Sequence, residues 1–482
     1  MENKNFYDSL PTIATADVVV AGGGIAGCSA AIASAREGAS TILIESGGCL
    51  GGSITGSLVA PISSVKSKDN KIEFGGILFE IMHEAGKIAQ AYCGAENKGA
   101  NWSGTSLHPY KYAFVKLLTE SNATPLFHMF VTDVVSDDKG KIEYIVVSTK
   151  AGLRKIKGKV FIDATGDGDI MGKSAADTIV GSEPNVLKSV TEDKSQRLES
   201  PKNLKSNDYV GQLQPVSYMM LYGNVDVEKA LQYMNKKLTF SQLGITKEEF
   251  LKWEYANTLG FETDETDTVP MPQGRVWLCA SARKNEAVIN MSRIIGVNAC
   301  DPLSYSDAEV KATLQLVAIM SFLKNFIPGF ENSYMIEYSS TLGIRESRRL
   351  IGDYVLTGRD TIQCKPFKDT IAHGSYIIDI HDPTGKRMAI GGQVHQNYYS
   401  IPYRCLVTRK VPNLATAGRS ISSDHVSMSS TRIQGTASLT GQAAGTAAAM
   451  AVKEDVSMSD VNVEKLQEKL INAKVFLDIP KE

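Results

Sequence analysis

The sequence lacks the features that mark several classes of protein. Its seven cysteines are an odd number and form no CxxC pair, which speaks against a disulfide framework and against a thiolate zinc or iron–sulfur site. The formal net charge is -2 and no polybasic stretch occurs, so we expect neither nucleic acid nor anionic lipid as a partner. No spacing of His, Asp and Glu is typical of a metal site, and no Ser/His/Asp pattern is typical of a hydrolase.

The chain also lacks a clear membrane or export segment. The first 17 residues are polar and have no apolar signal-peptide core. Residues 18–35 are apolar enough for a short membrane span, but four glycines between 22 and 27 favour a buried strand and helix. We therefore expect a soluble, cytoplasmic protein with no membrane partner. Its 482 residues, 43% of them hydrophobic, allow two or three domains.

What the sequence does contain is a strand–helix–strand unit near its start. The run VVVAGGGIAG at 18–27 predicts a buried parallel strand over 17–21, followed by a helix of small residues over 25–36. The apolar run STILIE predicts a second parallel strand over 40–45. The unit has about the length, ~30 residues, of a mononucleotide-binding βαβ motif.

The glycines of this unit have the spacing of a dinucleotide-binding turn. Gly22 permits the tight turn, Gly24 lets a pyrophosphate approach the backbone, and Gly27 lets helix and strand pack closely. The helix N-terminus then offers free N–H groups to the phosphates. Glu45 ends the second strand, where an acid commonly binds a ribose 2′-OH. The alternative is a Gly-rich packing turn with Glu45 as a plain surface acid.

Later segments predict a β-meander and a second domain. Three β-rich runs over 125–157, separated by turns, predict an antiparallel meander, after which KVFIDATGDGD returns as a buried strand. The polar stretch 184–213 predicts a surface loop or flap at a domain boundary. Residues 214–400 then mix strands with helices and indicate an α+β substrate domain. The helices of that domain are expected over 226–238, 246–257 and 306–327.

Further glycine-rich motifs decide which dinucleotide is expected. After Glu45 comes SGGCLGGSITGSL (46–58), a second Gly-rich loop where a simple NAD domain would begin a helix. Such a loop can lie along a pyrophosphate and reach toward a flavin ring. Near the C-terminus, VPNLATAGRS (411–420) predicts a last buried strand and a turn. A helix of small residues then follows over 432–453.

Taken together, these motifs resemble the FAD-dependent oxidoreductases with a glutathione-reductase-type FAD domain. This family is related to the flavoproteins of succinate dehydrogenase, fumarate reductase and heterodisulfide reductase. The resemblance covers about residues 16–455 and rests on the motifs GGGIAG, GGCLGG, IDATGDGD, LGIRESRR, DIHDP, IPYRCL and AGRSISSDHVSMSSTR.

The resemblance implies an α/β fold with FAD as the cofactor. An FAD-binding domain with a Rossmann-type βαβ unit and a β-meander would comprise 16–182 and 400–455, with an α+β substrate domain at 183–399 and a C-terminal helix or tail at 456–482. The implied reaction is a two-electron, hydride oxidation or reduction of a small organic substrate at flavin N5.

The resemblance also implies which residues contact FAD. They are Gly22, Gly24, Ile25, Ala26, Gly27, Glu45, Ser46, Gly51, Gly52, Ser53, Val131, Ala164, Thr165, Gly166, Asp167, Gly418, Arg419, Arg432, Gly435 and Thr436. The turn at 427–435 would open the last helix, so its N–H groups and Arg432 are candidates to stabilise the negative charge of reduced flavin. The alternative for Arg432 is a surface salt bridge.

Two departures from better-known relatives concern electron transfer. Cys49 has no second cysteine in a CxxxxC pair, so it is either a redox thiol or a small residue beside the cofactor. A second GxGxxG motif for a nicotinamide is missing, since FGGILF (74–79) and IGGQV (390–394) lack its spacing. Electrons would therefore pass between FAD and a substrate, a partner protein or a freely docking donor.

Hydride chemistry needs a proton donor or acceptor beside the substrate carbon. His381 in DIHDP and His425 in SSDHVS are the candidates, each with an aspartate close by in sequence that can fix its tautomer. A structural role is the alternative for both. Tyr403 as general acid and Arg404 as carboxylate clamp are competing assignments.

A cluster of arginines offers a substrate anchor. In TLGIRESRRLIGDY (341–354), a helix would place Arg345 on one face with Arg348 or Arg349. A guanidinium binds a carboxylate through two parallel hydrogen bonds, so Arg345 is a candidate catalytic-site anchor. A structural network with Glu346 or other nearby acids is the alternative.

Two other functions stay open at this point. One is an NAD-dependent dehydrogenase that uses the first βαβ unit alone, against which the meander and the C-terminal motifs speak. The other is a flavin-carrying subunit that relays electrons inside a larger redox complex. A small-molecule substrate is expected in either enzyme, and the sequence leaves open a redox partner protein and a homo-oligomer.

Overall fold

The strand–helix–strand unit forms as the sequence predicts. The computed structural model describes residues 2–59, 61–93, 108–183, 210–256, 267–272, 274–281, 283–383, 390–392 and 394–480. In it, β1 (Thr12–Ala21) leads into α2 (Ile25–Arg36) and then into β2 (Thr41–Ile44), which pairs in parallel with β1. Val18 to Val20 are fully buried, because helices cover this part of the sheet.

One long strand joins this unit to the meander. The main sheet has the order β3-β2-β1-β6-β5-β4, with β17 also paired with β6. The first half of β6 (Gly152–Asp163) pairs antiparallel with β5. On its other side β6 pairs in parallel with β1 from Lys155 to Asp163, and its last three residues also pair in parallel with β17. The predicted meander is confirmed, and its third strand continues without a break into the buried strand. The other strands are β3 (Ala123–Leu126), β4 (Phe130–Ser136), β5 (Ile142–Thr149) and β17 (Leu414–Thr416).

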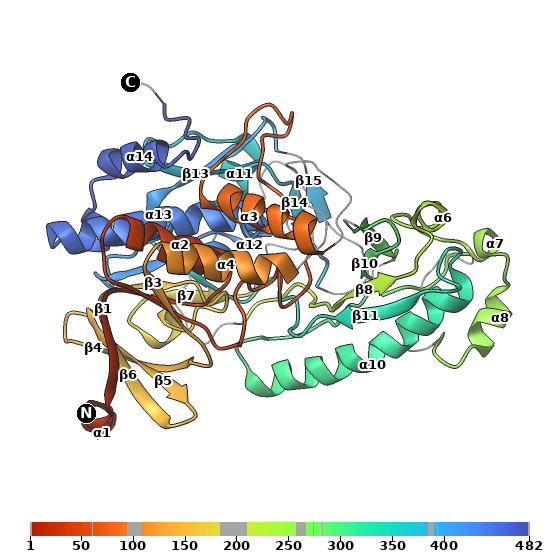
Figure 1. Cartoon of the computed structure of the whole chain (residues 1–482), viewed down its shortest axis with the longest axis horizontal. Helices are drawn as coiled ribbons and strands as arrows, with labels where there is room; N and C mark the ends of the chain where they lie inside the picture. The colour runs from red at the N-terminus through yellow and green to blue at the C-terminus, as the bar shows by residue number, and fades with distance from the viewer. Residues whose placement is uncertain are drawn as a thin grey trace.

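The small-residue helix near the C-terminus packs directly on α2 (Figure 1). It is α13 (Gln434–Glu454). A Cβ on Gly441 would lie 2.1 Å from the carbonyl oxygen of Ala26, and a Cβ on Gly445 would lie 2.0 Å from that of Ala30. The glycines therefore let the two backbones touch.

A second sheet and a long helix form the other part of the molecule, on the right in Figure 1. Its strand order is β11-β8-β10-β9. The helix α10 (Pro302–Phe326) has Asp301 as its N-cap and agrees with the helix predicted over 306–327. The strands are β8 (Met219–Gly223), β9 (Trp277–Ala280), β10 (Ala287–Asn290) and β11 (Tyr334–Tyr338).

Two helices predicted in this part are much shorter than expected. Only α6 (Val227–Leu231) forms within 226–238, where Asn235 then adopts a positive φ of 60°. In the described part of 246–257, only α8 (Lys247–Lys252) forms, because Trp253 takes an extended conformation and packs its ring against Phe326. Tertiary packing overrides helix propensity here.

The second part of the molecule has a hydrophobic core of its own, which ends near residue 342. The second core takes its residues from Val216 to Leu342. After that point the chain returns to the first part, where β12 (Arg348–Leu350) pairs with β7 (Thr178–Val180) and β13 (Thr370–Gly374) pairs with β16 (Tyr399–Pro402). The predicted substrate domain over 183–399 therefore differs from the extent of the second core.

The other elements complete the first part of the molecule. Most of the predicted surface loop, 184–209, lies outside the described residues. Within the described residues, no helix is both long and apolar enough to cross a membrane. Other helices and strands outside the second part include α1 (Glu2–Ser9), α3 (Ile77–Tyr92), α4 (His108–Glu120), α11 (Gly358–Gln363), β14 (Ile378–Ile380), β15 (Ile390–Gly392), α12 (His425–Thr431) and α14 (Val463–Asn472).

Candidate functional site

A cleft of about 1150 Å³ lies at the carboxyl ends of β1, β2 and β6. The Gly-rich turns after these strands line one side, and Met219, Trp277 and Tyr305 from the second part of the molecule line the other. Ligands of parallel α/β sheets bind at this edge, where the loops that follow the strands meet.

Bare backbone forms the floor of the cleft beside α2. Gly24 is the N-cap residue of α2. No side chain forms a capping hydrogen bond to the helix N-terminus, and the first turn carries no acidic residue. Gly24 also pairs in parallel with Gly51 of the second Gly-rich loop. A Cβ on Gly52 would lie 2.9 Å from the Cα of Gly24, whereas a Cβ on Gly24 itself would lie 3.9 Å from its nearest neighbour. The helix N-terminus therefore faces open space that fits a pyrophosphate.

Glu45 joins the two Gly-rich loops and lines the cleft. Its Oε2 accepts a hydrogen bond from the backbone N–H of Gly23 (2.7 Å), and its Oε1 accepts one from Gly47 (2.6 Å). The carboxylate therefore holds both loops in place. The ribose contact predicted for Glu45 stays a prediction.

The IDATGDGD turn closes the third side. The buried carboxylate of Asp163 accepts backbone hydrogen bonds from Ile170 and Met171, both at 2.9 Å. Burial raises the pKa of Asp163, and these hydrogen bonds oppose that rise. At the edge of the turn, Asp167 forms an ion pair with Arg419 (2.8 Å). Asp163 thus shapes the turn, and the Asp167–Arg419 pair faces the cleft.

Four of the predicted cofactor residues do not line the cleft. A Cβ on Gly27 would lie 1.8 Å from the carbonyl oxygen of Gly22, and one on Gly435 would lie 2.1 Å from that of Ser64. The other two also support the fold beneath the cleft: Gly51 packs against a threonine and Thr436 bonds to a buried serine. The predicted residues that do line the cleft are Gly22, Gly24, Ile25, Ala26, Glu45, Ser46, Gly52, Ser53, Val131, Ala164, Thr165, Gly166, Asp167, Gly418, Arg419 and Arg432.

Four charged or titratable side chains meet at another wall of the cleft: Arg345, Asp379, His381 and Arg432. The Nε2 atom of His381 lies 3.3 Å from Oδ2 of Asp379, and Nη2 of Arg432 lies 3.3 Å from the same oxygen. Nη1 of Arg345 donates to the carbonyl of Pro215 (2.6 Å) and to a serine hydroxyl.

Burial and mutual charge determine the protonation of this group. Burial and the charge of Arg432 lower the pKa of Arg345 to about 9. Burial and the charge of Arg345 lower the pKa of His381 to about 3, although its hydrogen bond to Asp379 opposes this. Burial disfavours the Asp379 carboxylate, but the hydrogen bond from His381 and the nearby arginines outweigh it and hold its pKa well below its ordinary value. At neutral pH the group therefore holds a neutral histidine, a carboxylate and two guanidinium ions.

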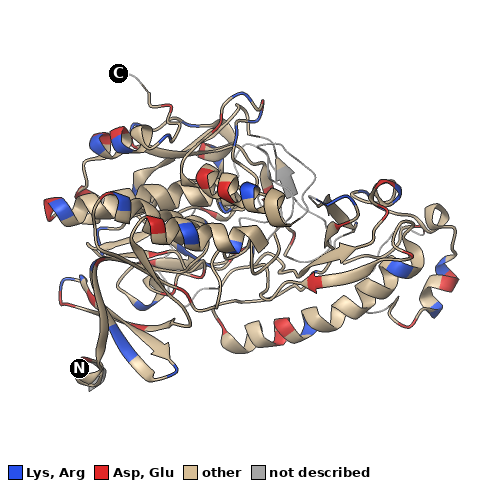
Figure 2. Cartoon of the chain, viewed as in Figure 1, with Lys and Arg blue, Asp and Glu red and all other residues tan. Residues whose placement is uncertain are grey.

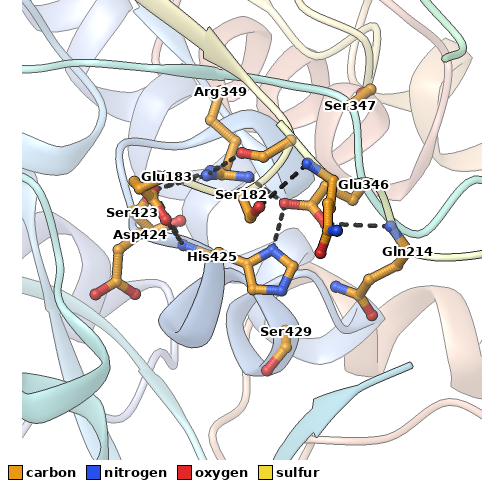
Figure 3. A network of polar contacts seen from close by, with 12 residues as sticks. Ser182, Glu183, Gln214, Glu346, Ser347, Arg349, Ser423, Asp424, His425 and Ser429 are labelled. Carbon is orange, nitrogen blue, oxygen red and sulfur yellow. Dashed lines mark hydrogen bonds and ion pairs between the residues drawn. The ribbon is translucent and has the colours of Figure 1, made fainter. Parts of the chain in front are cut away.

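His425, the second predicted proton donor, lies in a separate buried network (Figure 3). Its Nδ1 is 2.7 Å from Oε1 of Glu346, which also accepts a hydrogen bond from Arg349 (2.6 Å). Arg349 in turn pairs with Glu183 at 2.9 Å. His425 is fully buried and does not line the cleft, so the prediction that it contacts substrate is corrected to a structural role.

Tyr403 and Arg404 are also placed away from the cleft. The hydroxyl of Tyr403 donates to the carbonyl of Met458 (2.6 Å) in a fully buried position. Arg404 is half-exposed and forms two hydrogen bonds with Asp369, at 2.9 and 3.1 Å. The predictions of a general acid and a carboxylate clamp at these residues are therefore corrected to structural roles.

The predicted helix over the arginine cluster does not form. Residues 348–350 are a strand, β12, because they pair with β7. Arg345 and Arg348 both line the cleft, whereas Arg349 points into the buried network. The segment 427–435, predicted as a turn, is mostly helical, since α12 occupies 425–431 and Arg432 is its C-cap residue.

The second part of the molecule supplies cleft residues that no motif indicated. They include Cys300 and Trp277, whose ring lies under the Arg275 guanidinium at 5.1 Å. These residues follow no recognisable spacing, so only the tertiary fold reveals them. Cys49 also lines the cleft, and both interpretations of its thiol stand.

Comparisons with known proteins identify the family of the chain. In sequence, the chain is similar to the tRNA uridine 5-carboxymethylaminomethyl modification enzyme of Geotalea uraniireducens (strain Rf4), with 32% identity over 162 residues. The match covers 31% of this chain and 24% of that enzyme, so the chain spans about a quarter of the relative's length.

Two solved structures are similar over most of the chain. One is a geranylgeranyl bacteriochlorophyll reductase-like protein from Thermoplasma acidophilum (15% identity, 96% of this chain and 84% of that chain, TM-score 0.42). The other is p-nitrophenol 4-monooxygenase from Pseudomonas putida DLL-E4 (12% identity, 93% and 82%, TM-score 0.37). The model of the FAD dependent oxidoreductase family matches residues 17–470. The chain therefore belongs to the FAD-dependent oxidoreductase family, and its cofactor is FAD.

Proposed function

We propose that this oxidoreductase transfers two electrons, as a hydride, between FAD and a small organic anion such as a carboxylate. The observation that carries the proposal is the meeting of Arg345, Arg432 and His381 on one wall of the cofactor cleft. Two guanidinium ions there can bind an anion, and a neutral histidine beside them can exchange a proton with it.

Arg345 is suited to hold the anion. Its Nη1 is fixed by the carbonyl of Pro215 and the hydroxyl of Ser217, which orients the planar guanidinium. Its lowered pKa, about 9, means that its buried positive charge is poorly compensated. A carboxylate beside it would supply that compensation, so substrate binding and the charge of Arg345 stabilise one another.

His381 is suited to exchange the proton. Asp379 lies on its Nε2 side, so the Nε2–H donates to this carboxylate and the lone pair of Nδ1 remains to accept a proton. With a pKa of about 3, the imidazole in the free protein is a weak base because it is buried and because Arg345 is near. An anionic substrate cancels part of that positive field, which raises the basicity of His381 when substrate is bound.

The Gly-rich loops would hold the cofactor. The N-terminus of α2 at Gly24 would bind the pyrophosphate, and the loop around Gly52 and Ser53 lies next to it. Bound FAD supplies the two-electron acceptor or donor for the reaction. The chain's own contribution is to bind, orient and exchange a proton with the substrate.

Gly24→Val is expected to weaken FAD binding at least tenfold without unfolding the protein. Gly24 has φ of -68° and ψ of 179°, which any residue can adopt, and its Cβ would point into open space where the pyrophosphate is expected. FAD affinity of the apoprotein is measured by fluorescence quenching, and thermal unfolding of the same apoprotein is the control. Unchanged affinity would contradict the assignment of the pyrophosphate site.

Reoxidation of the reduced protein tests the proposed substrate class. The FAD-loaded protein is reduced anaerobically by light with a sacrificial amine as the electron donor, and the return of visible flavin absorbance is followed with paired α,β-unsaturated or α-keto acids and their methyl esters. The proposal expects reoxidation by at least one acid and much slower reoxidation by its ester. Equal rates for an acid and its ester would contradict the anion site. Reoxidation only by other redox proteins would favour an electron-transfer subunit.

A further inference from the structure

A stripe of apolar side chains runs along the outer face of α10. Leu303, Val310, Leu314 and Val317 are 81%, 57%, 65% and 44% exposed. Figure 2 shows the middle of this helix free of charged residues, with charges toward both ends. Exposed apolar residues that form a continuous stripe, and not a scatter, mark an interaction surface.

The stripe has the spacing of a coiled-coil seam. The positions 303, 307, 310, 314, 317, 321 and 324 alternate in steps of four and three residues, the 3.5-residue repeat of packed helix pairs. The opposite face of α10, with Ala312, Ile319 and Phe322, packs into the second core. The helix is therefore apolar on two faces. The second core of the same chain covers one of them, and the stripe remains exposed.

The charges on the seam show which partner fits. Asp307, which pairs with Lys311 of the same helix at 2.6 Å, lies seven residues before Leu314, and Lys324 lies seven residues after Val317. When two copies of α10 pair antiparallel, Leu314 of each copy faces Val317 of the other, and Asp307 faces Lys324 at both ends. A parallel pair would instead oppose Asp307 to Asp307 and Lys324 to Lys324. The seam is thus complementary to itself about a two-fold axis perpendicular to the helices, and not about one that runs along them.

We propose that two copies of this chain form a two-fold dimer through antiparallel packing of their α10 helices. Neighbouring groups extend the surface. Tyr338 of β11 is 41% exposed and packs on Tyr218, whose hydroxyl contacts Glu309 of α10. At the other end Trp253 donates a hydrogen bond from its indole nitrogen to Ser321 (3.0 Å), so an aromatic ring borders the seam there.

Charge reversal on the seam tests the proposal. The mass of the full-length, FAD-loaded protein is measured by sedimentation equilibrium across a concentration series. Wild type is expected to be a dimer. Because of the two-fold axis, Asp307→Lys or Lys324→Asp alone creates two like-charge pairs and is expected to weaken the dimer about tenfold. The double variant, Asp307→Lys with Lys324→Asp, restores both pairs and is expected to restore the dimer.

Two further variants complete the test. Lys453→Asp is the matched control, since Lys453 also lies in the last turn of a long helix, α13, but is outside the seam, and it should leave the dimer unchanged. Leu314→Asp, at an exposed position in the middle of the seam, is expected to give a folded, FAD-binding monomer. A monomeric wild type, an oligomer insensitive to Leu314→Asp, or a double variant as weak as the single ones would overturn the proposal.

Discussion

Arg345→Met is expected to lower kcat/KM for an anionic substrate by about a hundredfold or more, the effect of removing one partner of a buried ion pair. Met keeps most of the volume of the side chain, so the loss comes from the missing positive charge and its hydrogen-bond donors. The rate is measured by anaerobic reoxidation of the reduced protein with the best acid of the panel. Loss of reactivity with the acid, but not with a slow uncharged analogue, would locate the effect in anion binding.

Two matched measurements separate this role from a structural one. Arg404→Met removes an equally long side chain outside the cleft, where Arg404 pairs with Asp369, and should leave the rate unchanged. Arg345→Met should also raise the pKa of His381 from about 3, because the charge of Arg345 is one cause of that low value. NMR titration of the histidine reports this directly. A variant with normal kinetics or an unmoved His381 would refute the assignment.

The cofactor half of the site could be predicted from the sequence because it consists of local backbone. The turn at Gly22 to Gly27 and the loop around Gly52 depend on residues that lie close together in the chain, and strand–turn–helix patterning identifies them. The fold class follows in the same way, since alternating buried strands and a meander with clear turns leave few topologies. The position of Glu45 at the cleft could be predicted for the same reason, because Glu45 ends a predicted strand.

The substrate half could be predicted only in part, as Arg345, His381 and Arg432, because it is assembled by tertiary pairing. Arg345 and Arg349 are four residues apart and a helix would align them, yet the pairing of β12 with β7 sends them to different places. His381 and His425 lie in equally suggestive motifs, but only His381 lines the cleft. Nothing in the local sequence distinguishes them. The difference is that Glu346, far from His425 in the chain, is buried beside it.

Glu346→Gln is expected to destabilise the protein by about 3 kcal/mol, since it leaves buried cations without their carboxylate. Glu346 accepts from Arg349 at 2.6 Å and lies 2.7 Å from Nδ1 of His425, and all three side chains are almost fully buried. Arg349 keeps Glu183 as a partner, so the loss falls mainly on His425. Urea unfolding of wild type and variant gives the difference. Glu80→Gln, in an exposed pair with Arg36, is the control and should cost less than about 1 kcal/mol.

The pH dependence of that loss identifies its cause. Burial opposes the charge on His425, but Glu346 outweighs it and raises the pKa of His425 above its ordinary value. The folded chain therefore binds this proton more tightly than the unfolded chain, so the stabilisation is complete below about pH 6.5 and is lost as pH rises through the folded pKa. Without Glu346, burial and the charge of Arg349 oppose the proton and only the charge of Glu183 favours it, so acid becomes destabilising. The variant should thus lose more stability relative to wild type at about pH 6 than at about pH 9, and a difference independent of pH would show that His425 is neutral in the folded protein.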